Sequence, residues 1–93
     1  AISPNGNDKN DFFYIKNADK YPNNSLKIFD RNGIIIYDEN GYGIDSKLFY
    51  GKSNVNNSNA SLPSGSYFYI FSYLDELSKE TIVKKGVLTL INN

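Results

Sequence analysis

The stretch "SYFYIFSYL", residues 66–74, decides the fold of this chain. Side chains alternate between the two faces of a β-strand, so every second residue shares a face. One face of this stretch is aromatic and the other is largely apolar, which is typical of a strand in the middle of a sheet. The first face holds Tyr67, Tyr69, Phe71 and Tyr73, and the second holds Phe68, Ile70 and Leu74.

Strand signals recur on both sides of this stretch, and helix signals do not. Short aromatic and β-branched blocks are bounded by Gly, Pro, Asn or Ser. Asn32 and Gly33 lie between two apolar runs and predict a hairpin in which both residues take a positive φ. Gly86 predicts a kink in the last strand. The expected strands are residues 12–16, 25–30, 34–37, 48–50, 66–74 and 81–91, and a mobile polar loop is expected at 51–61. About six or seven short strands predict an antiparallel β-sandwich.

The composition excludes most enzyme classes. The 93 residues suffice for one domain, and their net charge of zero gives no basic face for nucleic acid. There is no Cys for a disulfide or thiolate zinc site, and no His for a Ser-His-Asp triad. No apolar run approaches the roughly 20 residues of a membrane-spanning helix. We therefore expect a protein that is not an enzyme, has no transmembrane segment and is monomeric as an isolated domain.

The loop "NGNDKND", residues 5–11, offers oxygen atoms of the kind that calcium prefers. The match to an EF-hand is poor, because no Glu follows at the far end of the loop. The preferred interpretation is an Asx-rich turn, in which side chains bond to nearby backbone N–H groups, and no cofactor is then expected. The alternative is a calcium site, with candidate ligands Asn5, Asn7, Asp8, Asn10 and Asp11.

Arg31 is the chain's single arginine and lies in the predicted hairpin. Its guanidinium could bind a carboxylate on a partner. The alternative is a local ion pair or stacking on an aromatic ring, and we prefer it from the sequence alone. Asp75, Glu76 and Glu80 are interpreted as a solvated hairpin tip rather than as paired catalytic carboxylates.

The motifs resemble a known family in the right order along nearly the whole chain. "SPNGNDKNDFFYI" is similar to the opening of the gliding-motility-associated C-terminal domain, where a P-N-G-D-G-x-N-D signature precedes an aromatic strand. "YPNNSLKIFDRNG" resembles its Y-P-x-N-x-L-x-I-F-N-R-W-G block, and "LPSGSYFYI" its L-P-x-G-T-Y-F-Y strand. "KKGVLTLI" is similar to the closing strand. Departures include Asn7 for Asp, Asp8 for Gly, and Asn32 for the usual Trp.

The resemblance implies a type B sorting domain of the type IX secretion system of Bacteroidetes. It implies an immunoglobulin-like fold of about seven strands and a single C-terminal domain, residues 1–93, cut from a larger surface or secreted protein. Such a domain would direct a cargo, often a cell-surface adhesin, through the periplasm and across the outer membrane. Its partners would be the secretion machinery and an outer-membrane protein of the β-barrel type. The expected recognition residues are Asp8, Asp11, Arg31, Asn32, Gly33, Val87, Leu88, Thr89, Leu90 and Ile91.

Two other classes of function stay open. A carbohydrate-binding or adhesive module would use exposed aromatic rings among Tyr42, Tyr50, Tyr67 and Tyr73. A passive structural spacer would have neither a ligand nor a partner.

Overall fold

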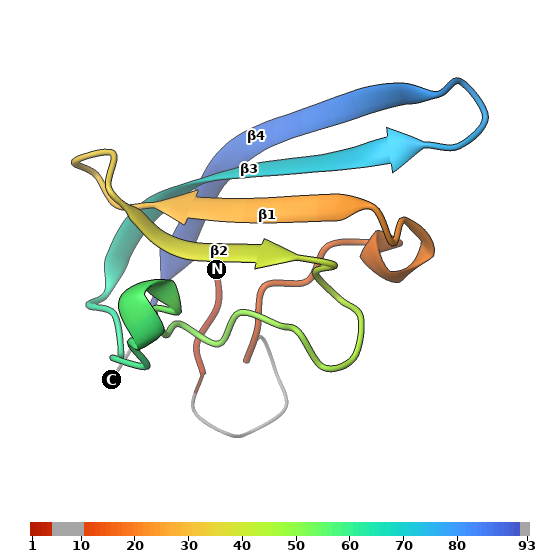
Figure 1. Cartoon of the computed structure of the whole chain (residues 1–93). Coiled ribbons are helices and arrows are strands. Elements are labelled where there is room, and N and C mark those ends of the chain that lie inside the picture. The colour runs from red at the N-terminus through yellow and green to blue at the C-terminus, as the bar shows by residue number, and fades with distance from the viewer. Residues whose placement is uncertain (5–10, 92–93) are drawn as a thin grey trace.

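The protein folds around one antiparallel sheet of four strands in the order β2-β1-β3-β4 (Figure 1). The computed structural model describes residues 1–4 and 11–91. The strands are β1 (Asn24–Phe29), β2 (Ile35–Asn40), β3 (Gly65–Asp75) and β4 (Glu80–Leu90). Two 3₁₀ turns, η1 (Ala18–Lys20) and η2 (Val55–Asn57), are the helical elements of the described residues.

The all-β, antiparallel class is confirmed, whereas the seven strands and the immunoglobulin-like sandwich are not. The described residues form one open sheet with four strands. Residues 12–16 and 48–50, both expected as strands, are not strands. They run past each other with one backbone hydrogen bond, from Phe13 N to Phe49 O at 3.1 Å. Their aromatic residues Phe13 and Phe49 instead pack against the core, so these segments supply side chains rather than a second ladder.

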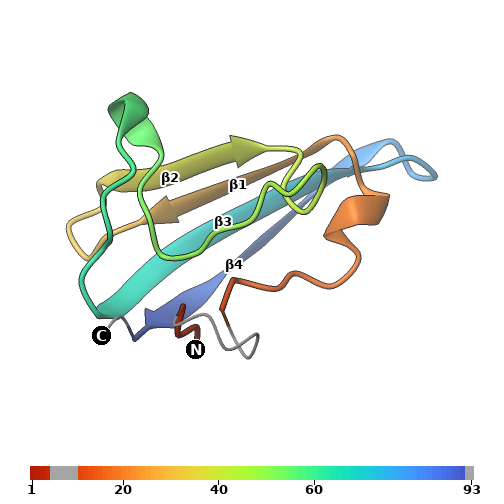
Figure 2. The ribbon, with the colours of Figure 1, turned by 90° about the horizontal axis from the view of Figure 1, so that it is seen from below.

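The core lies between one face of the sheet and these irregular segments (Figures 1 and 2). The expected central strand is β3, which pairs with β1 on one side and β4 on the other. Its inner face carries the four aromatic residues of the sequence pattern, and Tyr67 and Phe71 are buried there. The Tyr67 hydroxyl donates back to the carbonyl of Pro63 at 2.6 Å, which fixes the "LPSGSY" corner that leads into β3. The inner layer is completed mainly by Leu26, Ile28, Tyr37, Tyr42, Phe49, Leu88 and Leu90.

The β1–β2 hairpin is confirmed, but with a different turn. The N–H of Gly33 donates to Asp30 O at 2.9 Å, and Gly33 alone in this turn has a positive φ, of 78°. A β-turn followed by a left-handed glycine gives a longer hairpin loop than the two-residue turn expected. A bulge after Ile28 then makes Phe29 pair with Ile35. The extra residue, Ile36, packs against the core, and Ile35 stays on the outer face.

The β3–β4 register runs without a bulge from Gly65–Leu90 to Asp75–Glu80, so Gly86 does not interrupt the pairing of β4 with β3, and the expected kink there stays a prediction. Gly86 lies opposite Tyr69, and a Cβ atom there would meet the Tyr69 ring at 2.5–2.6 Å. The ring therefore occupies the space that a side chain at position 86 would take. The glycine serves a close approach across the pair, which is the other common reason for glycine in a strand.

The polar segment 51–61, expected as a mobile loop, is bonded to itself and to β2. Ser53 N donates to Ala60 O at 3.0 Å, and Leu62 N donates to Gly51 O at 2.9 Å. Asn54 N also donates to Ile36 O at 3.2 Å, which places the segment against β2.

Candidate partner-docking surface

The first predicted site lies mostly outside the described residues. Asn5, Asn7, Asp8 and Asn10 fall there, and Asp11, which is described, is half-buried. Residues 1–4 and 11–91 hold no group of three or more Asp or Glu side chains arranged for a metal ion. Calcium binding and recognition through Asp8 and Asp11 therefore stay predictions.

The turn at residues 31–33 presents an exposed cation. The Asp30 carboxylate accepts hydrogen bonds from Asn32 N at 2.9 Å and Ile34 N at 3.0 Å, so this acid stabilises the turn itself. Arg31 is exposed, and within the described ranges its guanidinium has no ion pair. The preferred interpretation is a local ion pair or stacking on an aromatic ring, and the ion-pair half of it finds no partner within the described ranges. A guanidinium in this state can bind a carboxylate of another molecule.

The start of β3 lies beside the Arg31 turn, and the end of β4 is the next strand over. A Cβ atom at Gly65 would lie 4.0 Å from Arg31 Nη2, and Gly65 pairs with Leu90. The positive charge of Arg31 also lowers the pKa of Tyr67, against the larger effect of burial and the effect of Asp30, which raise it. The fold thus brings the predicted turn and the predicted last strand to one end of the sheet.

The predicted last-strand residues divide between the two faces of the sheet. Leu88 and Leu90 are buried in the core, whereas Val87, Thr89 and Ile91 are exposed. The outer edge of β4 is occupied at this end, because Ile2 N donates to Thr89 O and Ile91 N donates to Ile2 O, both at 2.9 Å. The backbone groups of odd-numbered β4 residues therefore point away from β3.

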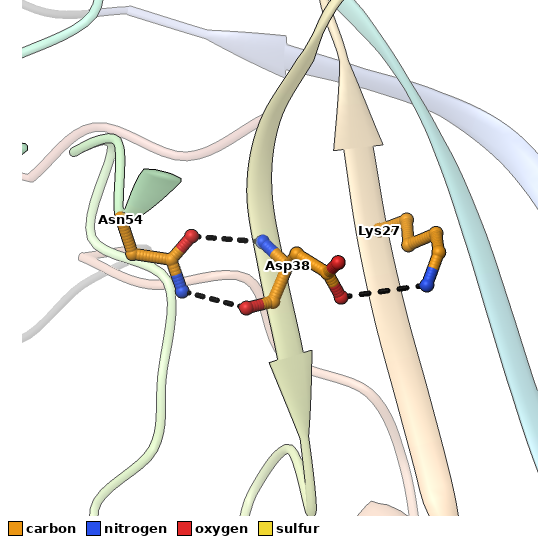
Figure 3. Close-up of polar contacts among 3 residues, drawn as sticks. All are labelled: Lys27, Asp38 and Asn54. Carbon is orange, nitrogen blue, oxygen red and sulfur yellow. Dashed lines mark hydrogen bonds and ion pairs between the residues drawn. The ribbon is translucent and has the colours of Figure 1, made fainter. Parts of the chain in front are cut away.

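The two edges of the sheet are protected to different extents. At β2, the side-chain amide of Asn54 bonds to the edge backbone as the backbone of a neighbouring strand would. Its Oδ1 accepts from Asp38 N and its Nδ2 donates to Asp38 O, both at 2.8 Å (Figure 3). At β4, no strand among the described residues pairs with the edge from Thr81 to Val87. An unpaired edge of this kind can accept an added strand.

The tyrosines expected to bind carbohydrate are mostly inaccessible. Tyr42 is 1% exposed and Tyr67 is 5% exposed, while the half-buried Tyr73 packs against Tyr21, with tilted rings whose centroids are 4.2 Å apart. Burial raises the pKa of Tyr42, and the hydrogen bond to Phe49 opposes this effect. Tyr50, at 45% exposure, borders a polar hollow of about 290 Å³, lined also by Glu39, Lys47, Lys52, Asn54 and Asn59.

Comparison with known families decides the identity of the domain. Residues 1–90 match the family model described as "CHU_C Type IX secretion signal domain". The chain belongs to this family. The domain is therefore a C-terminal export signal of type IX secretion, which implies transfer of its protein across the outer membrane to the cell surface or beyond. A secretion signal family is not an enzyme family, as expected from the sequence.

Other comparisons add little to the identity of this type IX secretion signal domain. A search of the curated proteins finds no match. The crystal structure of CopC from Methylosinus trichosporium OB3b is similar at 18% identity and a TM-score of 0.46, over 80% of this chain and 65% of that one. The chain thus spans about two thirds of that protein. No helix of the described part of the secretion signal domain is long and apolar enough to cross a membrane.

Sequence reasoning missed two features of the secretion signal domain. Asn54 was interpreted only as part of a polar loop, because nothing in the local pattern indicates that its side chain meets β2. The second feature is the outer face of the sheet, which no described segment covers (Figure 1). The apolar residues of the alternating pattern in β3 that fall on this face, Phe68, Ile70 and Leu74, were the available signal.

Proposed function

We propose that this domain is a sorting signal of the gliding-motility-associated, type B kind, which an outer-membrane partner of the secretion machinery recognises as a folded unit. The observation that carries the proposal is the family match over residues 1–90. The motif blocks "YPNNSLKIFDRNG" and "LPSGSYFYI" support the type B assignment and a source in Bacteroidetes. The cargo would be a cell-surface protein such as an adhesin.

The docking surface would be the end of the sheet that carries the Arg31 turn, together with the open edge of β4. Arg31 would bind a carboxylate of the partner, because its guanidinium has no ion pair within the described residues. Thr81, Val83, Lys85 and Val87 would offer outward backbone N–H and C=O groups to an added strand of the partner. The charged turn would then set the register of that strand.

An export assay tests the proposal. Residues 1–93 are fused to the C-terminus of a periplasmic fluorescent protein in a gliding bacterium, and surface and medium fluorescence is followed with and without the secretion system. We expect system-dependent export. Retention in the periplasm, with the fusion folded and intact, would contradict the sorting role.

Two variants of the fusion locate the docking surface. Arg31→Gln should lower export about tenfold if it removes one charge-assisted hydrogen bond of about 1.5 kcal/mol. Lys20→Gln is the matched control, since it also removes one exposed positive charge. Val83→Pro should block strand addition and leave the β3–β4 ladder intact, because the N–H of Val83 points away from β3. Val83→Ala is its control, and equal export by both variants would exclude the β4 edge.

The adhesive alternative is favoured by one observation, the exposed ring of Tyr50 beside a polar hollow. Such a ring can stack on a sugar, and the nearby amide and charged groups can bond to its hydroxyls. Binding to a glycan array that is lost in Tyr50→Ala would support this function. The absence of any bound glycan would exclude it.

A further inference from the structure

The outer face of the sheet carries an apolar row that runs across all four strands. The register aligns Ile35 of β2 with Phe29 of β1, then with Phe68 of β3 and Val87 of β4. Phe68 is 48% exposed and Val87 is 61% exposed. Part of the row borders a shallow hollow of about 370 Å³ over β1, β3 and β4. Exposed apolar surface that is contiguous across a sheet marks an interaction site more often than isolated exposed residues do.

The next row along the strands is charged, with opposite signs at its two ends. It aligns Asp38 of β2 with Lys27 of β1, Ile70 of β3 and Lys85 of β4. Lys27 Nζ lies 3.4 Å from Asp38 Oδ1, so these two side chains share the outer face (Figure 3). Lys85 has no ion pair within the described residues. The row therefore ends in a carboxylate on one edge of the sheet and in an unpaired ammonium on the other.

This arrangement is complementary to itself. A two-fold axis parallel to the strands, between β1 and β3, turns one sheet face down onto another and places each β2 over the β4 of the other copy. Rows stay aligned under this rotation, so Asp38 faces Lys85 of the second copy twice. Phe29 then faces Phe68 of the second copy, and Ile35 faces Val87. An axis across the strands would instead place β2 on β2 and β4 on β4, which pairs no Asp38 with Lys85.

We propose that the outer face is a homodimer interface, in which two copies stack their sheets through the Ile35–Phe29–Phe68–Val87 row and exchange two Asp38–Lys85 ion pairs. Sheets packed face to face lie about 10 Å apart, a distance that the side chains of the two outer faces fill. The apolar row supplies the association free energy, and the charged row selects the orientation. The proposal goes beyond recognition by the secretion machinery, and it departs from the monomer expected from the sequence.

The test is the mass of residues 1–93 in solution, measured by sedimentation velocity from about 10 µM to about 1 mM, because a small interface of this kind is weak. The mass should rise from 10.5 kDa towards twice that value. Phe68→Asp should abolish the rise. Leu77→Asp is the matched control, since Leu77 is 96% exposed at the β3–β4 turn, and it should dimerise normally. A monomer at every concentration, or equal dimerisation by both variants, would overturn the proposal and leave the face to a different protein.

A charge exchange tests the orientation of the two copies. Asp38→Lys and Lys85→Asp should each weaken self-association about tenfold, because each replaces two exposed attractions by two repulsions. A mixture of the two variants should form a heterodimer again. In this heterodimer, the substituted position 38 of one copy faces the substituted position 85 of the other, and their charges are opposite. The unsubstituted Lys85 of the first copy faces the unsubstituted Asp38 of the second, as in the native dimer. The double variant should dimerise with itself. If neither combination restores association, the proposed two-fold axis is wrong.

Discussion

Asn24 and Tyr42 lie 18 residues apart and bind each other as two paired strands would. Asn24 Oδ1 accepts from Tyr42 N at 2.7 Å, and its Nδ2 donates to Tyr42 O at 3.1 Å. The same Nδ2 also lies 3.2 Å from Ala18 O and 2.9 Å from Tyr21 O. One buried amide thus joins the η1 turn, the start of β1 and the loop after β2. The asparagine of the Y-P-x-N block is explained by this junction.

Loss of the Asn24 amide should destabilise the domain strongly. Asn24→Ala removes the amide partner of Tyr42 N and of the Tyr21 and Tyr42 carbonyls in a site that is 6% exposed, whereas Ala18 O still accepts from Tyr21 N. Each unsatisfied buried group costs about 1–3 kcal/mol, so we expect the free energy of unfolding to fall by at least about 3 kcal/mol. Urea unfolding measures this change. Asn23→Ala, at the exposed neighbouring residue, should change the free energy by less than about 0.5 kcal/mol, and equal effects would refute the role of Asn24.

Replacing Gly86 by alanine should destabilise the domain when Tyr69 is present, and much less when the ring of Tyr69 has been removed. Gly86→Ala places a methyl group against that ring, which also packs on Phe13 with centroids 4.9 Å apart. Overpacking of this kind costs about 1–3 kcal/mol. In a Tyr69→Ala background the same substitution should cost much less, because the obstructing ring is gone. Thermal unfolding of the natural chain, the two single variants and the double variant gives the coupling energy between positions 69 and 86. Additive effects of the two substitutions would disprove the coupling.

The free energy of unfolding of the domain should fall at alkaline pH. Burial is the main cause that raises the pKa of Tyr37, Tyr42 and Tyr67 above its usual value near 10. Above about pH 10 the unfolded chain releases these protons and the native protein keeps them, so stability falls as the pH rises. The slope reaches about 1.4 kcal/mol per pH unit for each tyrosine.

Tyr42→Phe separates this effect from general alkaline damage. The variant loses the bonds from the hydroxyl to Phe13 O at 2.6 Å and from Phe49 N at 2.9 Å, so it should be less stable at neutral pH. Above about pH 10, its free energy of unfolding should nevertheless fall less steeply with pH, because the contribution of one tyrosine is missing. Melting temperature and phenolate absorbance against pH check both points. An unchanged slope would show that Tyr42 ionises equally in both states.

Calcium should not change the stability of the domain if residues 5–11 form an Asx-rich turn. Thermal unfolding in millimolar calcium and in excess chelator should then give the same midpoint. Binding to the native state alone would instead raise the free energy of unfolding by about 2.7 kcal/mol at a hundredfold excess over the dissociation constant. A rise that Asp8→Asn and Asp11→Asn abolish would establish a calcium site.

The alternation of residues 66–74 predicted β3 and its central place, and the structure shows that its aromatic face is the inner one. The Asn32–Gly33 pair predicted the β1–β2 hairpin. The turn type was missed, because Asp30 bonds to the N–H groups of Asn32 and Ile34 and favours a longer loop. The close approach of the Tyr69 ring to Gly86 was missed for a related reason, since a glycine's role depends on the residue opposite, which is known only once the strands are paired.

The sequence by itself determined the all-β class, the main strands and the family, since these depend on the local residue order and on motifs read along the chain. The tertiary structure decided which apolar segments became strands. Residues 12–16 and 48–50 are as aromatic as true strands, but they meet the sheet through side chains and form no ladder. It also decided that Arg31 lies beside the start of β3, at the end of the sheet where β4 finishes, and that Asp38 and Lys85 are the two ends of one charged row. Such relationships depend on strand order and register, which are set by packing of the whole chain rather than by any single segment.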